Sequence, residues 1–208
     1  MPDDARPNLT EPLFDPSQDV ITEAASLHGL AHPLRLRLLH LLRREGPSTA
    51  SRLAEALNMS SGLTSYHVRE LAKAGFVVDA TAEDLIHVQR GGGRERWWKA
   101  TRRSTYVNPP PVGDEDAAAA TTEYLGALLE AQFANARQWL TEAHRWPEQW
   151  QGLSNFSDVT LSLTPVQTRE LEVASAGLLA RYPRCEPGAP ADEGAGSVNI
   201  QYQVFPVR

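Results

Sequence analysis

SRLAEALNMSSGLTSYHVRELAKAGFV, residues 51–77, is the stretch that decides the fold. Thr49 or Ser48 is expected to cap a short helix whose buried residues are Leu53, Ala54 and Leu57. Residues 58–62 are rich in side chains that hydrogen-bond to their own backbone, which predicts a turn. A second helix is expected to begin near Ser60 or Ser61 and to stop at Gly75. Its buried residues are predicted to be Leu63, Tyr66 or His67, Val68 and Leu71. This order is typical of a helix-turn-helix unit.

Two helices are predicted upstream of this unit. From Asp19, apolar residues at 20, 21, 24, 27 and 30 follow a helical period, and Asp19 can cap its start. A second helix is expected to begin at Pro33 and to end at Gly46. Its apolar stripe is predicted to consist of Leu34, Leu38, Leu41 and Leu42.

Downstream, FVVDA, LIHVQR and RERWWKA are rich in residues that favour strands. If the three glycines at 91–93 form a hairpin loop, Arg90 pairs with Arg94, and Ile86 pairs with Trp98. Because side chains alternate along a strand, Trp98 is then expected in the core. Trp97 is then expected to contact another element of the chain or another subunit. The alternatives for the glycine run are a disordered linker or an RNA contact of the Arg-Gly-Gly type.

These segments together resemble an ArsR-type winged helix-turn-helix regulator over residues 19–106. The most specific parts are AHPLRLRLL, residues 31–39, and the run from Ser61 to Val77. The GRERWW hairpin is similar to that of larger, actinobacterial-like members of this family with a C-terminal extension. The resemblance implies a homodimer that binds double-stranded DNA and regulates transcription, with repression as the expected sign.

The candidate DNA-binding residues lie on the second helix of the unit and on the hairpin. Small polar side chains at the start of a recognition helix can reach base edges, and the helix N-terminus favours phosphate. Basic residues further along the helix and around the glycines are expected to bind phosphates. The predicted contacts are Ser60, Ser61, Thr64, Ser65, His67, Arg69, Lys73, Arg90, Arg94 and Arg96. The competing interpretation is an ordinary solvated helix face.

The charge distribution agrees with a polyanion partner for this segment. Residues 28–106 carry 13 Lys/Arg and 7 Asp/Glu, whereas the remaining residues carry 7 and 19. A basic segment within an acidic chain predicts a nucleic-acid-binding face on one part of the molecule. Two solvated surfaces of opposite sign remain the alternative.

The C-terminal half is predicted to be a separate α+β domain, residues 116–208, after a linker at 107–115. A long apolar helix is expected from Asp116 to Arg145 and would serve as a dimerisation arm. It is followed by a strand in SDVTLSLT, residues 157–164, and by a helix that Thr164 caps and that ends near Tyr182. VNIQYQVF, residues 198–205, alternates as a last strand. The aromatic residues that could line an effector pocket, a core or a dimer seam are Phe133, Trp139, Trp146, Trp150 and Phe156. The whole chain is therefore expected to be of the α+β class.

Other classes of function have little support in the sequence. The single cysteine, Cys185, and histidines without an uninterrupted i, i+4 pair predict no metal site and no cofactor. No catalytic motif is present, so we expect no enzyme. Residues 1–18 read as a flexible tail without a secretory apolar segment, and no run of about 18 apolar residues occurs. We therefore expect a cytoplasmic protein without a membrane partner. Two rivals stay open, a protein-interaction module without DNA binding and a metal- or redox-responsive regulator that uses histidines and Cys185.

Overall fold

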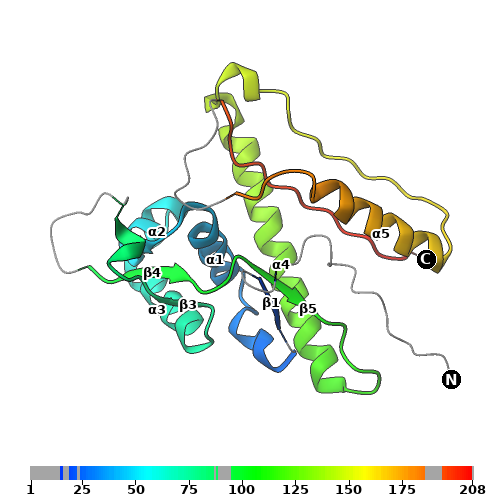
Figure 1. The fold of residues 1–208 in the computed structure, drawn as a ribbon, viewed down its shortest axis with the longest axis horizontal. Helices are drawn as coiled ribbons and strands as arrows, with labels where there is room; N and C mark the ends of the chain where they lie inside the picture. The colour runs from blue at the N-terminus through cyan, green and yellow to red at the C-terminus, as the bar shows by residue number, and fades with distance from the viewer. Residues whose placement is uncertain are drawn as a thin grey trace. The chain divides into compact units, whose positions relative to one another are not determined.

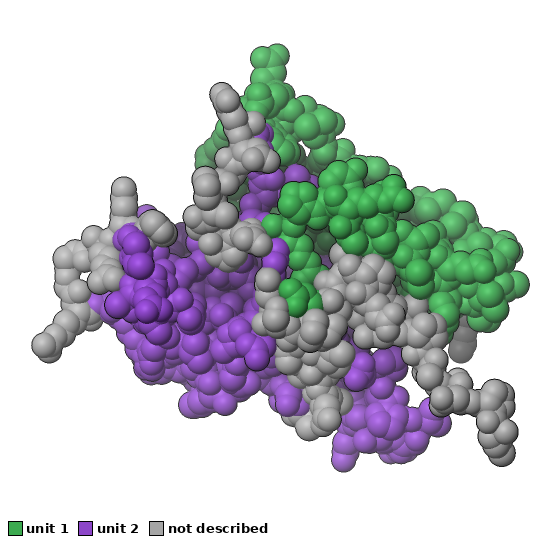
Figure 2. Space-filling model, viewed as in Figure 1, with its two compact units in different colours: residues 1–15, 134–184, 199–208 green, residues 16–133, 185–198 purple. Residues whose placement is uncertain are grey.

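The computed structural model describes residues 15, 19–22, 24–86, 88, 95–185 and 194–207. The chain divides into two compact units, coloured separately in Figure 2. The larger unit comprises residues 16–133 and 185–198. The smaller unit comprises residues 1–15, 134–184 and 199–208. Predictions for the tail at 1–18 and for the glycine run at 91–93 concern residues outside the described ones, apart from Asp15.

The first long helix of the larger unit, α1 (Pro33–Glu45), is placed by local signals (Figure 1). The side chain of His32 caps it, because its Nδ1 accepts a hydrogen bond from the backbone N–H of Leu34 at 3.1 Å. Gly46 ends the helix with a φ of 87°, a conformation that glycine adopts at little cost. The predicted stripe is confirmed, and Leu39 joins it. The buried residues are Leu34, Leu38, Leu39, Leu41 and Leu42.

Two further helices follow, α2 (Ala50–Leu57) and α3 (Ser61–Lys73). Thr49 caps α2 by accepting from the N–H of Arg52 at 3.3 Å, as predicted. Ser60 caps α3 by accepting from the N–H of Leu63 at 3.3 Å. Between the helices, Asn58 is left-handed with φ 53° and ψ 49°, and its side chain type tolerates that conformation. The predicted helix, turn and helix are therefore present.

A three-stranded antiparallel sheet packs with these helices in the order β2 (Ser48–Thr49), β4 (Trp97–Ala100) and β3 (Val77–Asp79). Trp98 lies opposite Asp79 on one side and Ser48 on the other. The predicted pairing of Ile86 with Trp98 is wrong, because Glu83–Leu85 form a short 3-10 turn, η2.

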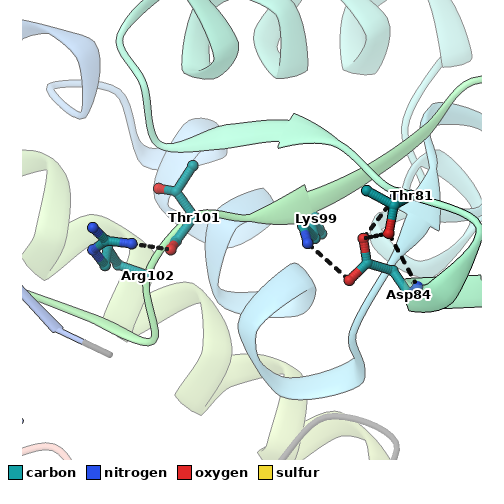
Figure 3. A network of polar contacts seen from close by, with 5 residues as sticks. All are labelled: Thr81, Asp84, Lys99, Thr101 and Arg102. Carbon is teal, nitrogen blue, oxygen red and sulfur yellow. Dashed lines mark hydrogen bonds and ion pairs between the residues drawn. The ribbon is translucent and has the colours of Figure 1, made fainter. Parts of the chain in front are cut away.

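Side-chain hydrogen bonds explain why no strand begins there. Asp84 accepts from the N–H and the hydroxyl of Thr81 at 2.7 and 2.8 Å, which closes a turn. The ammonium of Lys99 on β4 then binds the same carboxylate at 2.8 Å, as Figure 3 shows. These bonds lower the pKa of Asp84, the Lys99 hydrogen bond most of all. The turn fixes residues 81–85 against β4 and buries Leu85.

The region before α1 differs from the expected helix over residues 19–30. Asp19–Thr22 form a strand, β1, which pairs in parallel with β5 (Ser104–Val107). The residues of the run VIT are β-branched, and pairing with β5, a strand not expected from the sequence, fixes it as a strand. A 3-10 helix, η1 (Ala24–Gly29), follows. Gly29 is required there, because a Cβ would lie only 2.4 Å from the Cβ of Ala74.

The core of the larger unit collects side chains from η1, α1, α2, α3, β3 and β4, with Leu53 as the contribution of α2. It contains Leu27 and Leu30, the α1 leucines, Val68 and Leu71, Phe76 and Val77, Trp98, and Tyr124 of a later helix. Arg43 crosses its edge, and its Nε and Nη2 donate to the carbonyl of Arg102 and the hydroxyl of Thr105 at 2.9 and 2.6 Å. Burial lowers the pKa of Arg43 to about 10, still far above neutral, so the guanidinium remains charged.

The long helix α4 (Glu115–Glu142) begins one residue before the predicted start and ends three residues before the predicted end. Asp114 caps it by accepting from the N–H of Ala117 at 2.9 Å. The helix buries a narrow row of mainly small side chains. This row consists of Ala120, Tyr124, Ala127 and Ala131. Larger apolar side chains of this helix are exposed instead. They are Leu125, Leu129, Phe133 and Leu140, between 47% and 64% exposed.

The smaller unit contains the helix α5 (Pro165–Leu179) and a cluster of tryptophans. Thr164 and Gln167 form the predicted capping box at the start of α5. Trp146 directly follows the short 3-10 helix η3 (Ala143–Arg145). Its ring centroid lies 5.4 Å from that of Trp139 near the end of α4 and 6.1 Å from that of Trp150 in the 3-10 helix η4 (Glu148–Trp150).

The two strands predicted in the C-terminal half do not form in the described part of the chain. Residues 153–164 and 195–207 are assigned to no ladder. The described residues of the domain expected at 116–208 therefore form helices joined by segments that belong to no ladder. Among the described helices, none has the length and hydropathy needed to cross a lipid bilayer.

Candidate nucleic-acid interface

The helix α3 presents one side to solvent while its other side is fixed to the core. Its N-terminal end is held by the Ser60 cap and by the turn, in which the N–H of Met59 donates to the carbonyl of Ala54 at 2.8 Å. Ser60 and Ser61 are exposed, Ser65 is half-buried, and Arg69 and Lys73 are exposed. Five of the predicted contacts are therefore gathered along one helix and accessible to a large partner.

Two predicted contacts on α3 are instead part of its buried side. Thr64 is 0% exposed and His67 is 5% exposed, and they share this side with Val68 and Leu71. The prediction that Thr64 and His67 face DNA is therefore corrected. The reason is the helical period, because residues 64, 67, 68 and 71 lie on one face at about 100° per residue. The expected burial of Leu63 is also wrong, since this side chain is 40% exposed.

The outward side of α3 contains a residue that sequence reasoning missed. Tyr66 is 52% exposed and lies between Gly62 and Arg69 on the outer side of the helix. A Cβ placed on Gly62 would have no atom within 4 Å, so the backbone is open at this point. The signal that would have found Tyr66 is the same helical period, measured from Val68 and Leu71 rather than from Leu63.

Beneath α3, two histidine rings lie 4.3 Å apart. They are His67 and His32, the residue that caps α1. Burial lowers the pKa of both, and nearby positive charge adds to this, from Arg35 for His32 and from His32 and Arg35 for His67. The Nδ1 of His67 has no hydrogen-bond partner among the described residues. Both rings are therefore favoured in the neutral form, and protonation would disturb the packing of α3 on α1.

The charged residues at the edge of the site are partly neutralised. Arg96 binds Asp79 through two hydrogen bonds of 2.6 and 2.9 Å, and its guanidinium lies 4.0 Å from the centroid of Trp98. The bond to Arg96 lowers the pKa of Asp79. Lys73 pairs with Glu70 at 2.6 Å. Both cations are exposed, although Glu70 is half-buried, so a phosphate could compete for either cation at small cost. The predicted contacts Arg90 and Arg94 lie outside the described residues.

The adjacent tryptophans are separated by strand alternation, as expected. Trp98 belongs to the core, whereas Trp97 lies outside the core cluster. Trp97 is nevertheless only 8% exposed, with the guanidinium of Arg52 on α2 at 4.8 Å from its ring centroid. Its partner is thus the first turn of α2, which ties this helix to β4.

Comparison with known families points to the same part of the chain. The family model of a helix-turn-helix domain matches residues 30–79, which contain α1, α2, α3 and β3. No curated protein matches the chain. In the described residues, no group of three or more His, Cys, Asp or Glu is placed to hold a metal ion. The chain therefore contains a helix-turn-helix domain, which suggests a DNA-binding regulator.

Proposed function

We propose that this protein is a sequence-specific regulator of transcription and that α3 is its recognition helix. The observation that carries the proposal is the two-sided arrangement of α3 within the matched helix-turn-helix domain. Four residues anchor the helix, and its capped N-terminal half exposes Ser60, Ser61 and Tyr66. A helix held in this way can enter the major groove with its first turns nearest the bases.

The sheet supports a winged, ArsR-type arrangement. β3 directly follows α3, β4 is its antiparallel neighbour, and the chain between them contains the glycine run. We propose that this hairpin is the wing and that Arg90, Arg94 and Arg96 bind phosphates there. The exposed pairing of Arg96 with Asp79 would be exchanged for a phosphate on binding.

We also propose that the working form is a homodimer that represses by occupying its operator. A dimer reads two half-sites, which raises both affinity and specificity. The exposed side chains of α4 support this part of the proposal. Leu125, Leu129 and Phe133 lie on the solvent side of a helix whose other side packs on the core. Apolar residues repeated in this way are typical of a helix that packs against a partner.

A protein-interaction module is the second candidate, and one observation favours it. Leu63 and Tyr66 are apolar or aromatic, and both are exposed on α3. A protein partner would use such side chains as anchors, whereas a DNA reader would use them against the thymine methyl group or the sugar.

Selection from random DNA duplexes tests the proposal. The expected result is an enriched site with two related halves about 10 base pairs apart or a multiple of this. In binding assays, Tyr66→Ala is expected to reduce the discrimination between bases by ~1–3 kcal/mol at one or two base pairs of that site. Tyr182→Ala, also exposed but in the smaller unit, is the matched control and should bind as the wild type does.

Arg69→Ala separates backbone contact from base contact. It should weaken binding to all duplexes and reduce the log–log salt slope by about one. If no sequence is enriched and Tyr66→Ala binds DNA as well as the wild type, α3 is not a recognition helix. The protein-interaction module would then be the better description.

A further inference from the structure

Exposed apolar side chains of the helix-turn-helix domain gather at the N-terminal end of α3. Residues 30–79, all of which the structure describes, leave four large apolar side chains exposed. Three of them, Met59, Leu63 and Tyr66, lie in the first two turns of α3 or just before them. The fourth, Val78, lies on β3. The apolar side chains are therefore concentrated where a recognition helix would meet the edges of the bases.

The helical period places Tyr66 in the middle of the outward side of α3. At about 100° per residue, this side lies opposite the four buried residues of the helix. It consists of Gly62, Tyr66, Arg69 and Lys73. Leu63 flanks this row on one edge, and the half-buried Ser65 flanks it on the other. A Cβ on Gly62 would meet no atom within 4 Å, so a base pair can approach the backbone there and contact Tyr66 and Leu63.

Side chains that recognise a base by charge or by two hydrogen bonds do not occur at this end of α3. Arginine or lysine reads guanine, asparagine or glutamine reads adenine, and aspartate or glutamate accepts from cytosine. None of these residue types is present from Ser60 to Val68. Asn58 precedes the cap, in the turn between α2 and α3, and Arg69 is the first such residue within the helix. The N-terminal half of α3 therefore offers serine hydroxyl groups, which bond to several bases, and exposed apolar groups.

We infer that α3 recognises thymine through its 5-methyl group and that Tyr66 and Leu63 are the specificity-determining contacts. In the major groove, this methyl group is the apolar feature that distinguishes thymine from the other three bases. An apolar side chain that covers the methyl group removes apolar surface of both partners from water. Arg69, further along the same side, then binds phosphate without reading the sequence. The inference rests on the proposed recognition helix and names the chemical group that this helix reads.

Duplexes that differ only in this methyl group test the inference. Deoxyuridine has the hydrogen-bonding groups of thymidine and lacks the methyl group, so each thymine of the selected site is replaced by uracil in turn. At one or two positions of each half-site, the affinity of the wild-type chain should fall about fourfold, which is the effect of uncovering one methyl-sized group. Fluorescence anisotropy with the full chain measures these affinities.

Variants of the chain assign the methyl contact to particular side chains. Tyr66→Ala and Leu63→Ala should each bind the thymine duplex and its uracil counterpart with nearly equal affinity at one of these positions. Tyr66→Phe keeps the ring and should keep the fourfold difference, whereas recognition through the tyrosine hydroxyl would be lost. Leu171→Ala on α5 is the matched control, because Leu171 is 38% exposed and Leu63 is 40% exposed. This control should distinguish thymine from uracil as the wild type does.

The contrary outcomes separate this inference from the proposed function. If a site is selected but contains no thymine, or if uracil leaves every affinity unchanged, α3 remains a recognition helix and the reading of the methyl group is wrong. A fourfold difference that persists in both Tyr66→Ala and Leu63→Ala would come from the shape or stiffness of the duplex and would also overturn the inference. If no sequence is selected, the proposed function and the inference fail together, and Leu63 and Tyr66 are better explained as anchors for a protein partner.

Discussion

The surroundings of α3 and of α5 differ in how far they cover apolar side chains. Around α3, leucines from α1, Phe76 and Trp98 cover the buried side chains, and three strands pair with each other. Around α5, residues 153–164 and 195–207 have neither a covering layer nor a partner strand among the described residues. The first region therefore contains its own core, whereas the apolar side chains Val159 and Leu161 of the second are exposed. This difference separates a region that contains its own hydrophobic core from one whose apolar side chains are largely exposed.

The largest expected effect is on the core of the first region. Leu38 is 0% exposed on α1, and Leu38→Ala should lower the free energy of unfolding by ~2–5 kcal/mol at every protein concentration. Leu161→Ala, at a site 55% exposed, should cost less than ~1 kcal/mol in dilute solution, where single chains predominate. Urea unfolding at two protein concentrations measures both. Similar losses for the two variants in dilute solution would remove the contrast between the regions.

A smaller effect is expected when the histidines beneath α3 are protonated. Burial lowers the pKa of His32 and His67 below 6.5, so the unfolded chain binds more protons than the folded chain as the pH falls. Stability should be full above pH 6.5 and should decrease below it. His32→Asn keeps an oxygen that can cap α1, and His67→Leu removes a buried nitrogen without a partner among the described residues.

Thermal unfolding between pH 7.5 and pH 5 measures this dependence. Each variant should have a shallower loss of Tm on acidification than the wild type. Carboxyl groups titrate at a lower pH than histidines and are the same in all three proteins. The difference between the Tm curves therefore reports the two histidines. Parallel curves of Tm against pH for the wild type and the variants would show that protonation of the two rings does not affect stability.

Local signals predicted the helices well, and tertiary partners explain what was missed. The caps at Thr49, Ser60 and Thr164 depend on residues three positions apart, which a single sequence displays. The face of α3 could not be assigned in the same way. Both Leu63 and Thr64 suit a buried position by size, and only the packing of α3 against its neighbouring elements selects Thr64.

Strands were harder to predict because their partners are distant. β1 pairs with β5 some 85 residues later, and a helical period across residues 20–30 obscured it. Leu85 and Ile86 looked like a strand, but the hydrogen bonds of Asp84 impose a turn. In the C-terminal half, residues 157–164 and 198–205 do alternate between apolar and polar side chains. A strand nevertheless requires a partner, and the described residues of one chain supply none.

The smallest expected effect concerns two glycines, one in each region. A Cβ on Gly62 in α3 or on Gly177 in α5 would meet no atom within 4 Å. Since glycine weakens a helix, Gly62→Ala and Gly177→Ala should each raise the free energy of unfolding by about 0.5–1 kcal/mol. If Gly62 lets the backbone of α3 approach DNA, its alanine variant should bind the selected duplex more weakly despite this gain. Gly177→Ala should bind that duplex as the wild type does, because α5 has no part in DNA recognition. Fluorescence anisotropy with the selected duplex measures both affinities, and undiminished binding by Gly62→Ala would place the first turn of α3 too far from DNA for close contact.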